Sequence, residues 1–167
     1  MEFNLQKHAS KIAYVNFREE KHGEESVLAV DVKITTDVPN DFLSYLSPGL
    51  KAAVYEKELG QRDLIADDNH LSHLRFPDLG TLAWSGTMVR AAVVIHGVKK
   101  SQDLELVADV TKLKLDPKEG GTVSITFTVQ LCPNESQAAH LPIWLGKEAK
   151  VSVGPNTEEI PPAGENA

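Results

Sequence analysis

Alternating apolar and polar residues predict that much of this chain forms half-buried β-strands. The clearest case is Thr122–Leu131, where Val123, Ile125, Phe127 and Val129 alternate with serine, threonine and glutamine. Such a period of two places one set of side chains in a core and the other in solvent. Similar patterns predict further strands at residues 11–18, 27–35, 88–96, 104–115 and 147–153.

Two of these segments depart from simple alternation. Residues 88–96 contain the apolar run Ala-Ala-Val-Val-Ile, which predicts a central strand buried on both faces. In residues 104–115 the apolar positions change phase once, from Leu104, Leu106 and Ala108 to Leu113 and Leu115. A β-bulge inserts one extra residue and would produce that change of phase.

Polar segments between the strands predict tight connections. Residues 19–25 carry five charged residues and one glycine, and we expect a hairpin tip there. Residues 116–121 end in Gly120 and Gly121, which accept a positive φ, and should join two antiparallel strands.

The segment from 37 to 70 has a different pattern. Phe42, Leu43, Tyr45 and Leu46 recur at helical spacing, and Asn40 precedes them as a plausible N-cap. Residues 50–55 fit a helix or a strand equally well. Residues 137–145 are expected to form one or two helical turns.

These elements predict a mainly β protein, a single-domain β-sandwich or open barrel of six to seven strands with a short helical insertion. Residues 1–153 would form the domain, with an acidic insertion at 37–70. Residues 154–167 contain three prolines and three glutamates with few apolar residues, which indicates a flexible acidic tail.

Charge and cysteine content narrow the classes of function. The net charge is −7, of which −4 falls within residues 37–68 and −3 within 154–167. The remaining chain is neutral, which argues against non-specific binding to duplex DNA. The single cysteine and the absence of a signal-peptide pattern or an 18-residue apolar stretch predict a cytoplasmic protein with no membrane partner.

The sequence patterns of this chain predict that it is not an enzyme and that it holds no cofactor and no metal. Nucleophile-elbow, dinucleotide-binding, P-loop and deaminase patterns are absent from the sequence. His70 and His73 with Asp67 and Asp68 form the one metal-like cluster, which we interpret as an exposed acidic loop. Cys132 lacks a sequence-adjacent base other than His140 and is interpreted as a packed strand end.

The sequence predicts two alternative binding surfaces. An acidic surface with an aromatic anchor would contact a protein partner through Glu19, Glu20, Glu24, Glu25, Asp63, Asp67, Asp68 and Trp84. A basic and aromatic surface would contact single-stranded DNA through Lys11, Tyr14, Arg18, Lys112 and Lys114.

Several stretches resemble a family of small phage and prophage proteins encoded in early, DNA-handling gene regions. The resemblance is carried by structural segments: 18–25, the Ala-Val-Asp-Val-Lys strand at 29–33, Asn-Asp-Phe-Leu at 40–43, Leu-Arg-Phe-Pro at 74–77 and Glu-Gly-Gly-Thr-Val at 119–123. It implies a bacterial host cytoplasm and transfers no active-site residues.

The favoured hypothesis is therefore a non-catalytic phage accessory protein that binds a host or phage protein, either inhibiting a bacterial defence system or supporting phage DNA recombination. Single-stranded DNA binding is the alternative, and a virion structural component is the third hypothesis. A homo-oligomer is compatible with each of them.

Overall fold

A computed structural model describes residues 1–58 and 70–157 of the chain. The strands are β1 (Leu5–His22), β2 (Glu25–Pro39), β3 (Tyr55–Glu56), β4 (His73–Leu74), β5 (Leu82–Trp84), β6 (Met88–His96), β7 (Leu104–Pro117), β8 (Thr122–Leu131) and β9 (Glu148–Gly154). Short helical segments are η1 (Asn40–Phe42), α1 (Leu43–Leu46), α2 (Leu50–Val54), η2 (Lys100–Gln102), α3 (Glu135–His140) and η3 (Leu141–Trp144).

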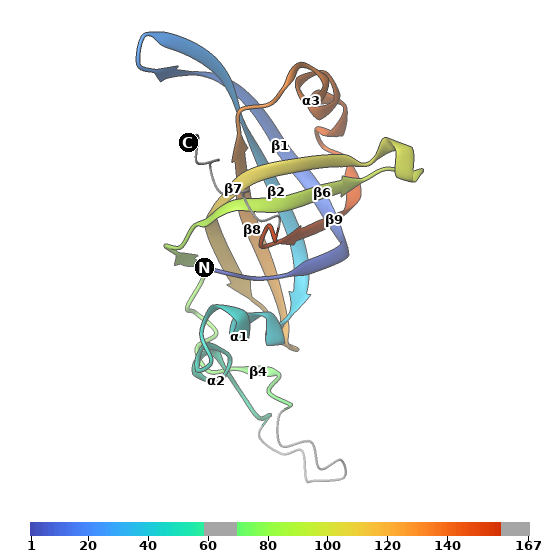
Figure 1. The fold of residues 1–167 in the computed structure, drawn as a ribbon. Helices are drawn as coiled ribbons and strands as arrows, with labels where there is room; N and C mark the ends of the chain where they lie inside the picture. The colour runs from blue at the N-terminus through green and yellow to red at the C-terminus, as the bar shows by residue number, and fades with distance from the viewer. Residues whose placement is uncertain (59–69, 158–167) are drawn as a thin grey trace, which may run out of the picture.

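Six antiparallel strands close into a barrel (Figure 1). They pair in the order β7-β6-β9-β1-β2-β8, and β8 pairs back with β7. The fold is thus mainly β, as the alternation predicts, and the sheet closes into a barrel. Closure leaves few unpaired strand edges, which limits edge-to-edge association. The short strand β5 adds to β7 where the pairing between β6 and β7 has ended.

The predicted bulge lies in the middle of β7. The register of β7 against β8 shifts between Thr111 and Lys114, and Lys112 has a φ of 53°. The slip keeps both apolar sets of the strand on the same side, so Leu106 and Leu113 are both buried in the barrel. The prediction of a bulge at this change of phase is confirmed.

Inward-facing side chains of the barrel strands form one core. Val123, Ile125, Phe127 and Val129 are all fully buried, which confirms the strand and its register. The ring of Phe3 packs edge-on against Phe127 and against Phe42 of η1, with ring centroids 5.7 and 5.2 Å apart. The core is therefore continuous from the barrel into the helical insertion.

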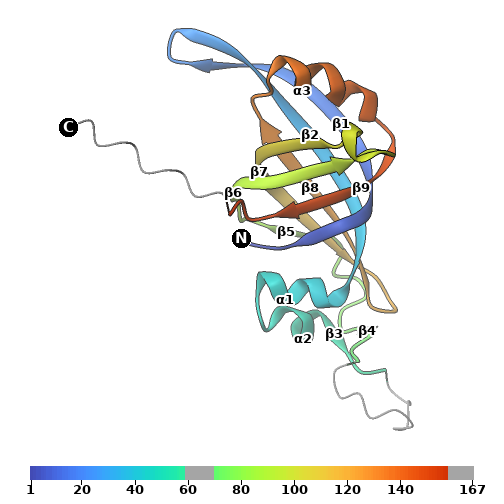
Figure 2. The same ribbon diagram turned by 45° about the vertical axis from the view of Figure 1, so that its right-hand side comes forward.

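The two helical regions lie at opposite ends of the barrel (Figures 1 and 2). Helices α1 and α2 lie below the barrel in these views, and α3 with η3 lies at the other end. The insertion is held on the β7–β8 turn: the Tyr55 hydroxyl donates to the carbonyls of Lys118 and Thr122 at 2.8 and 3.1 Å. Burial raises the pKa of Tyr55, so its hydroxyl stays protonated as this donor.

Three local expectations need correction or completion. Asn40 does not cap a helix: it is buried within η1, and its amide donates to the carbonyl of Leu71. β6 is buried on one face, while Val89 and Arg90 are exposed and Val94 is half-buried, because the barrel wall has a solvent side. Residues 50–55, left open by the pattern, form helix α2 followed by the first residue of β3.

The β1–β2 hairpin extends beyond the barrel wall (Figure 2). Its last pairs are Lys21 with Ser26 and His22 with Glu25, which confirms the predicted hairpin, but its tip is shorter than the expected 19–25: the strands continue to His22 and from Glu25, and only Gly23 and Glu24 form the turn. None of the described helices is long and apolar enough to cross a membrane.

Candidate nucleic-acid interface

The outer face of four neighbouring strands carries lysines and threonines in register. Lys11 of β1 is opposite Thr35 of β2, Thr35 is opposite Thr126 of β8, and Thr126 is opposite Lys114 of β7. The hydroxyl oxygens of Thr35 and Thr126 lie 3.2 Å apart. A polar row therefore crosses the barrel wall from β7 to β1.

A second row runs beside the first. It contains Thr111, Thr128, Lys33 and Tyr14, paired in that order across β7, β8, β2 and β1. The Tyr14 side chain is 52% exposed and lies next to Lys33 in this row. In this second row the Thr111 hydroxyl and Thr128 are buried, so the groups that it presents to solvent are the Lys33 ammonium and the Tyr14 ring.

A hollow of about 480 Å³ lies over these rows, and we call it the lysine hollow. Its lining residues are Lys33, Thr35, Thr81, Lys112, Lys114, Asp116, Lys118, Ser124, Thr126 and Thr128. Four ammonium groups thus face one carboxylate, and five hydroxyls lie between them. Lysine side chains and Ser/Thr hydroxyls are common ligands for phosphate oxygens in nucleic acids.

The bulge in β7 shapes this hollow. Lys112 occupies the extra position of the bulge, and Lys114 resumes the ladder opposite Thr126. Both lysines are exposed and line the same hollow. The slip that keeps the core side of β7 apolar therefore gathers two positive charges on its outer side.

The lysines of this face are available to a ligand. Across residues 1–58 and 70–157, Lys11, Lys33, Lys112, Lys114 and Lys118 make no side-chain ion pair within 4.0 Å. The carboxylate of Asp37 lies beside the hollow, where it accepts a hydrogen bond from Ser124 Oγ, one of the lining residues. Within the described residues, an anion binding to these ammonium groups would therefore not have to displace a paired carboxylate.

A second hollow continues the surface past Thr35 towards β9. It has a volume of about 690 Å³ and includes Lys11, Thr35, Glu148 and Lys150 in its lining. Its charges are balanced, since Asp37 and Glu148 accompany the two lysines. The two hollows share Thr35, and the excess of positive charge lies in the lysine hollow.

The structure brings together four of the five residues predicted to contact single-stranded DNA. Lys11, Tyr14, Lys112 and Lys114 share the outer face described above. Arg18 lies apart, where its guanidinium contacts Asp31 at 3.2 Å and Glu20 at 2.9 Å. Hydrogen bonds to Asp31 and then Glu20 raise the pKa of Arg18, and its positive charge is already paired with these two carboxylates.

Sequence reasoning missed Lys33 and Lys118 as members of this face. The signal for Lys33 was present, because it alternates with the buried Val32 and Ile34 and must point outward. Lys118 lies in the β7–β8 turn, beyond any periodic pattern, and required the structure to place it.

The residues predicted to contact a protein partner do not form one surface. Glu19, Glu24 and Glu25 lie at the hairpin tip, while Trp84 of β5 is half-buried against the core. Glu20 pairs with Arg18. The remaining three, Asp63, Asp67 and Asp68, lie outside the described residues, as does the tail from residue 158.

The structure describes only the two histidines of the cluster considered as a metal site. His73 Nδ1 lies 2.7 Å from Glu119 Oε1, and His70 is exposed. Hydrogen bonds from His73 and from the Leu74 N–H hold the pKa of Glu119 below its usual range. These contacts fasten the insertion to the β7–β8 turn, and Asp67 and Asp68 are not described.

Cys132 is exposed rather than packed at the strand end, and it has a different neighbour from the one considered in the sequence. His140 bonds the carbonyl of Ser136 at 2.6 Å, whereas folding places His22 and Glu20 beside Cys132. These three residues line a hollow of about 290 Å³ with Arg18, Arg90 and Asp109, among others.

No protein-family model matches this chain, and no curated protein or solved structure shows significant similarity to it.

Proposed function

We propose that this protein binds single-stranded nucleic acid, without catalysis, along the outer face of β7, β8, β2 and β1. The observation that supports the proposal is the lysine hollow, in which Lys33, Lys112, Lys114 and Lys118 surround a floor of threonine and serine hydroxyls. Lysines bind phosphates as point charges, and hydroxyls donate to the same oxygens.

The dimensions of the face favour a single strand over a duplex. Neighbouring strands lie about 4.8 Å apart, so the path from β7 to β9 covers roughly 19 Å, a few nucleotides of single strand. The longest helix in the described ranges is α3, with six residues. No described helix is therefore suited to reading a major groove, the usual mode of duplex recognition.

The composition of the face argues against a protein interface at this place. Lysine is depleted in the centres of protein–protein interfaces, where aromatic residues and arginine are enriched. The lysine hollow has the reverse composition, and the exposed Tyr14 beside Lys33 offers one surface for stacking a base. Such a role also suits the DNA-handling gene regions that the sequence resemblance implies.

Protein binding through the hairpin is the second candidate function. The tip with Glu24 and Glu25 extends away from the barrel (Figures 1 and 2), and neither residue lines the lysine hollow. Reversing both glutamates to lysine should then slow association with that partner, because rim charges chiefly control the association rate. In infected cells, a partner captured equally by the parent and the reversed protein would argue against this role.

The test of nucleic-acid binding is fluorescence anisotropy with labelled oligothymidine at low salt. Replacing Lys112 and Lys114 by glutamate should abolish binding, because the reversal places two carboxylates where phosphates are expected. The matched control replaces Lys99 and Lys100, which are exposed in and beside η2 at the other end of β7. That control carries the same change in net charge and should bind like the parent.

Two results would contradict the proposal. One is the absence of binding by the parent protein at low salt. The other is an equal loss in both double variants, which would show that net charge rather than the lysine hollow controls binding.

A further inference from the structure

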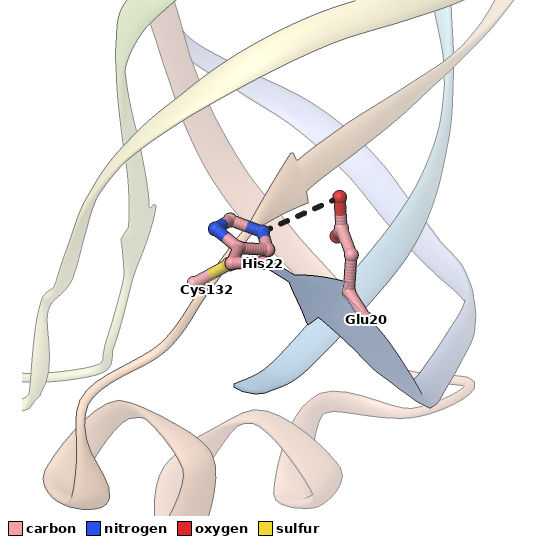
Figure 3. A group of neighbouring side chains, drawn as sticks. All are labelled: Glu20, His22 and Cys132. Atoms are coloured by element: carbon pink, nitrogen blue, oxygen red, sulfur yellow. Dashed lines mark ion pairs between the residues drawn. The ribbon is translucent and has the colours of Figure 1, made fainter. Parts of the chain in front are cut away.

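The end of β1 and the end of β8 bring a carboxylate, an imidazole and a thiol together (Figure 3). Glu20 and His22 are two residues apart on β1, so their side chains point to the same side of the strand. Cys132 follows the last residue of β8. In the described part of the chain, these residues form the one group of three or more His, Cys, Asp and Glu side chains placed to hold a metal ion.

The distances within this group suit a tetrahedral ion. His22 Nε2 lies 3.6 Å from Glu20 Oε1, and one ligand atom from each of the three residues lies within 4.8 Å of the others. Zinc binds nitrogen, oxygen and sulfur at about 2.0–2.3 Å, so adjacent ligands in a tetrahedron are roughly 3.3–3.8 Å apart. The His22–Glu20 pair already has that spacing, and a small side-chain rotation would bring in Cys132.

A neighbouring cation orients the carboxylate. Arg18 Nη1 donates to Glu20 Oε2 at 2.9 Å, and the same guanidinium is held by Asp31. The second oxygen, Oε1, is thereby left facing His22. Partners of this kind fix the direction of a metal ligand and commonly change metal affinity by 10- to 100-fold.

We propose that Glu20, His22 and Cys132 bind a zinc ion in a three-ligand site. A thiolate with an imidazole and a carboxylate favours zinc over magnesium or calcium, which prefer oxygen ligands alone. The fourth position opens on the hollow lined by Arg90, Asp109 and Gln130, where water completes the tetrahedron. The ion ties the projecting hairpin to the barrel at the end of β8.

The site is independent of the lysine hollow. Its residues come from the hairpin and from the end of β8, and the two hollows share no lining residue. Zinc binding and nucleic-acid binding can therefore fail separately in experiments.

The experiment is a zinc titration of the full-length, chelator-treated and reduced protein, followed by isothermal calorimetry and thermal unfolding. We expect one zinc per chain and a rise in melting temperature with zinc concentration, because an ion that binds the folded state stabilises it. Cobalt in place of zinc should give the near-ultraviolet charge-transfer band of a thiolate ligand.

Variants locate the site. Cys132→Ser and His22→Ala should each abolish the cobalt–thiolate band and the zinc-dependent rise in melting temperature. Arg18→Gln should retain the band and weaken zinc affinity by about 10- to 100-fold, because Arg18 orients Glu20 and is not itself a ligand. His140→Ala and a double His70→Ala, His73→Ala variant are matched controls that should bind zinc like the parent.

Either of two outcomes would overturn the proposal. The parent protein could fail to bind zinc or cobalt in the micromolar range. Alternatively, zinc binding could persist in Cys132→Ser and His22→Ala and disappear in one of the histidine controls.

Discussion

Salt dependence provides a quantitative test of the lysine hollow. Five lysines, Lys11, Lys33, Lys112, Lys114 and Lys118, lie on the proposed face without an ion pair in the described structure. Each phosphate contact with single-stranded DNA contributes about −0.7 to the slope of log K against log salt, so five contacts predict a slope of about −3.5. Affinity should then fall about 100-fold between roughly 50 and 200 mM salt.

Replacing single lysines by neutral glutamine measures how much each lysine contributes to that slope. Lys112→Gln and Lys114→Gln should each reduce its magnitude by about 0.7, and together they should leave roughly a 20-fold salt effect over the same range. Lys99→Gln in the β6–β7 connection should leave the slope unchanged. Anisotropy titrations at four or five salt concentrations measure these slopes, and melting temperatures confirm that each variant is folded. A parent slope near zero, or a slope that falls only in Lys99→Gln, would refute the reasoning.

Three further predictions concern stability. Phe127→Ala should lower the free energy of unfolding in urea by about 3–5 kcal/mol, because Phe127 is fully buried against Phe3, and a loss below about 1 kcal/mol would show a loosely packed site. A carboxylate whose pKa is lowered by folding stabilises the protein above its unfolded pKa, and that contribution is lost as the pH falls through the folded pKa. Glu119→Gln should thus flatten the decline in melting temperature on acidification below about pH 5, and unchanged acid profiles would contradict the role of its contact with His73. Thr111→Val should raise stability by about 1 kcal/mol, because the buried Thr111 hydroxyl has no hydrogen-bond partner among the described residues, and a loss of stability in urea would show that this hydroxyl is satisfied by water.

The sequence predicts the strands well because burial on one face of a barrel wall imposes a period of two. The alternation in β8 and the change of phase in β7 both follow from the need to keep apolar side chains inside. Closure of the barrel could not be predicted from this alternation. It depends on the pairing of β7 with both β6 and β8, and the strand pattern is the same for an open sheet.

The candidate sites likewise contain some residues that local periodicity predicts and others that only the folded chain brings together. Lys11, Lys112 and Lys114 could be predicted to face outward from local periodicity, and closure then brings β1 and β7 within reach of one ligand. The contact between His22 and Cys132 could not be predicted, because β2 separates β1 from β8 in the sheet. It arises where the side chains of Glu20 and His22, near the end of β1, lie beside Cys132, which follows β8 (Figure 3).

Net charge proved a poor guide to the surface because the charges of this chain are segregated. The surplus of acidic residues falls by sequence within 37–68 and 154–167, while the rest of the chain, which contains most of the barrel strands, is neutral overall. Within those strands, the lysines of β2, β7 and the β7–β8 turn line one hollow with a single carboxylate. At physiological salt a charge is screened within about 8 Å, so a ligand in the hollow experiences the lysines that line it more strongly than charges beyond that range. An acidic protein can therefore present a basic binding face when alternation along its strands and a bulge direct the lysines to one side.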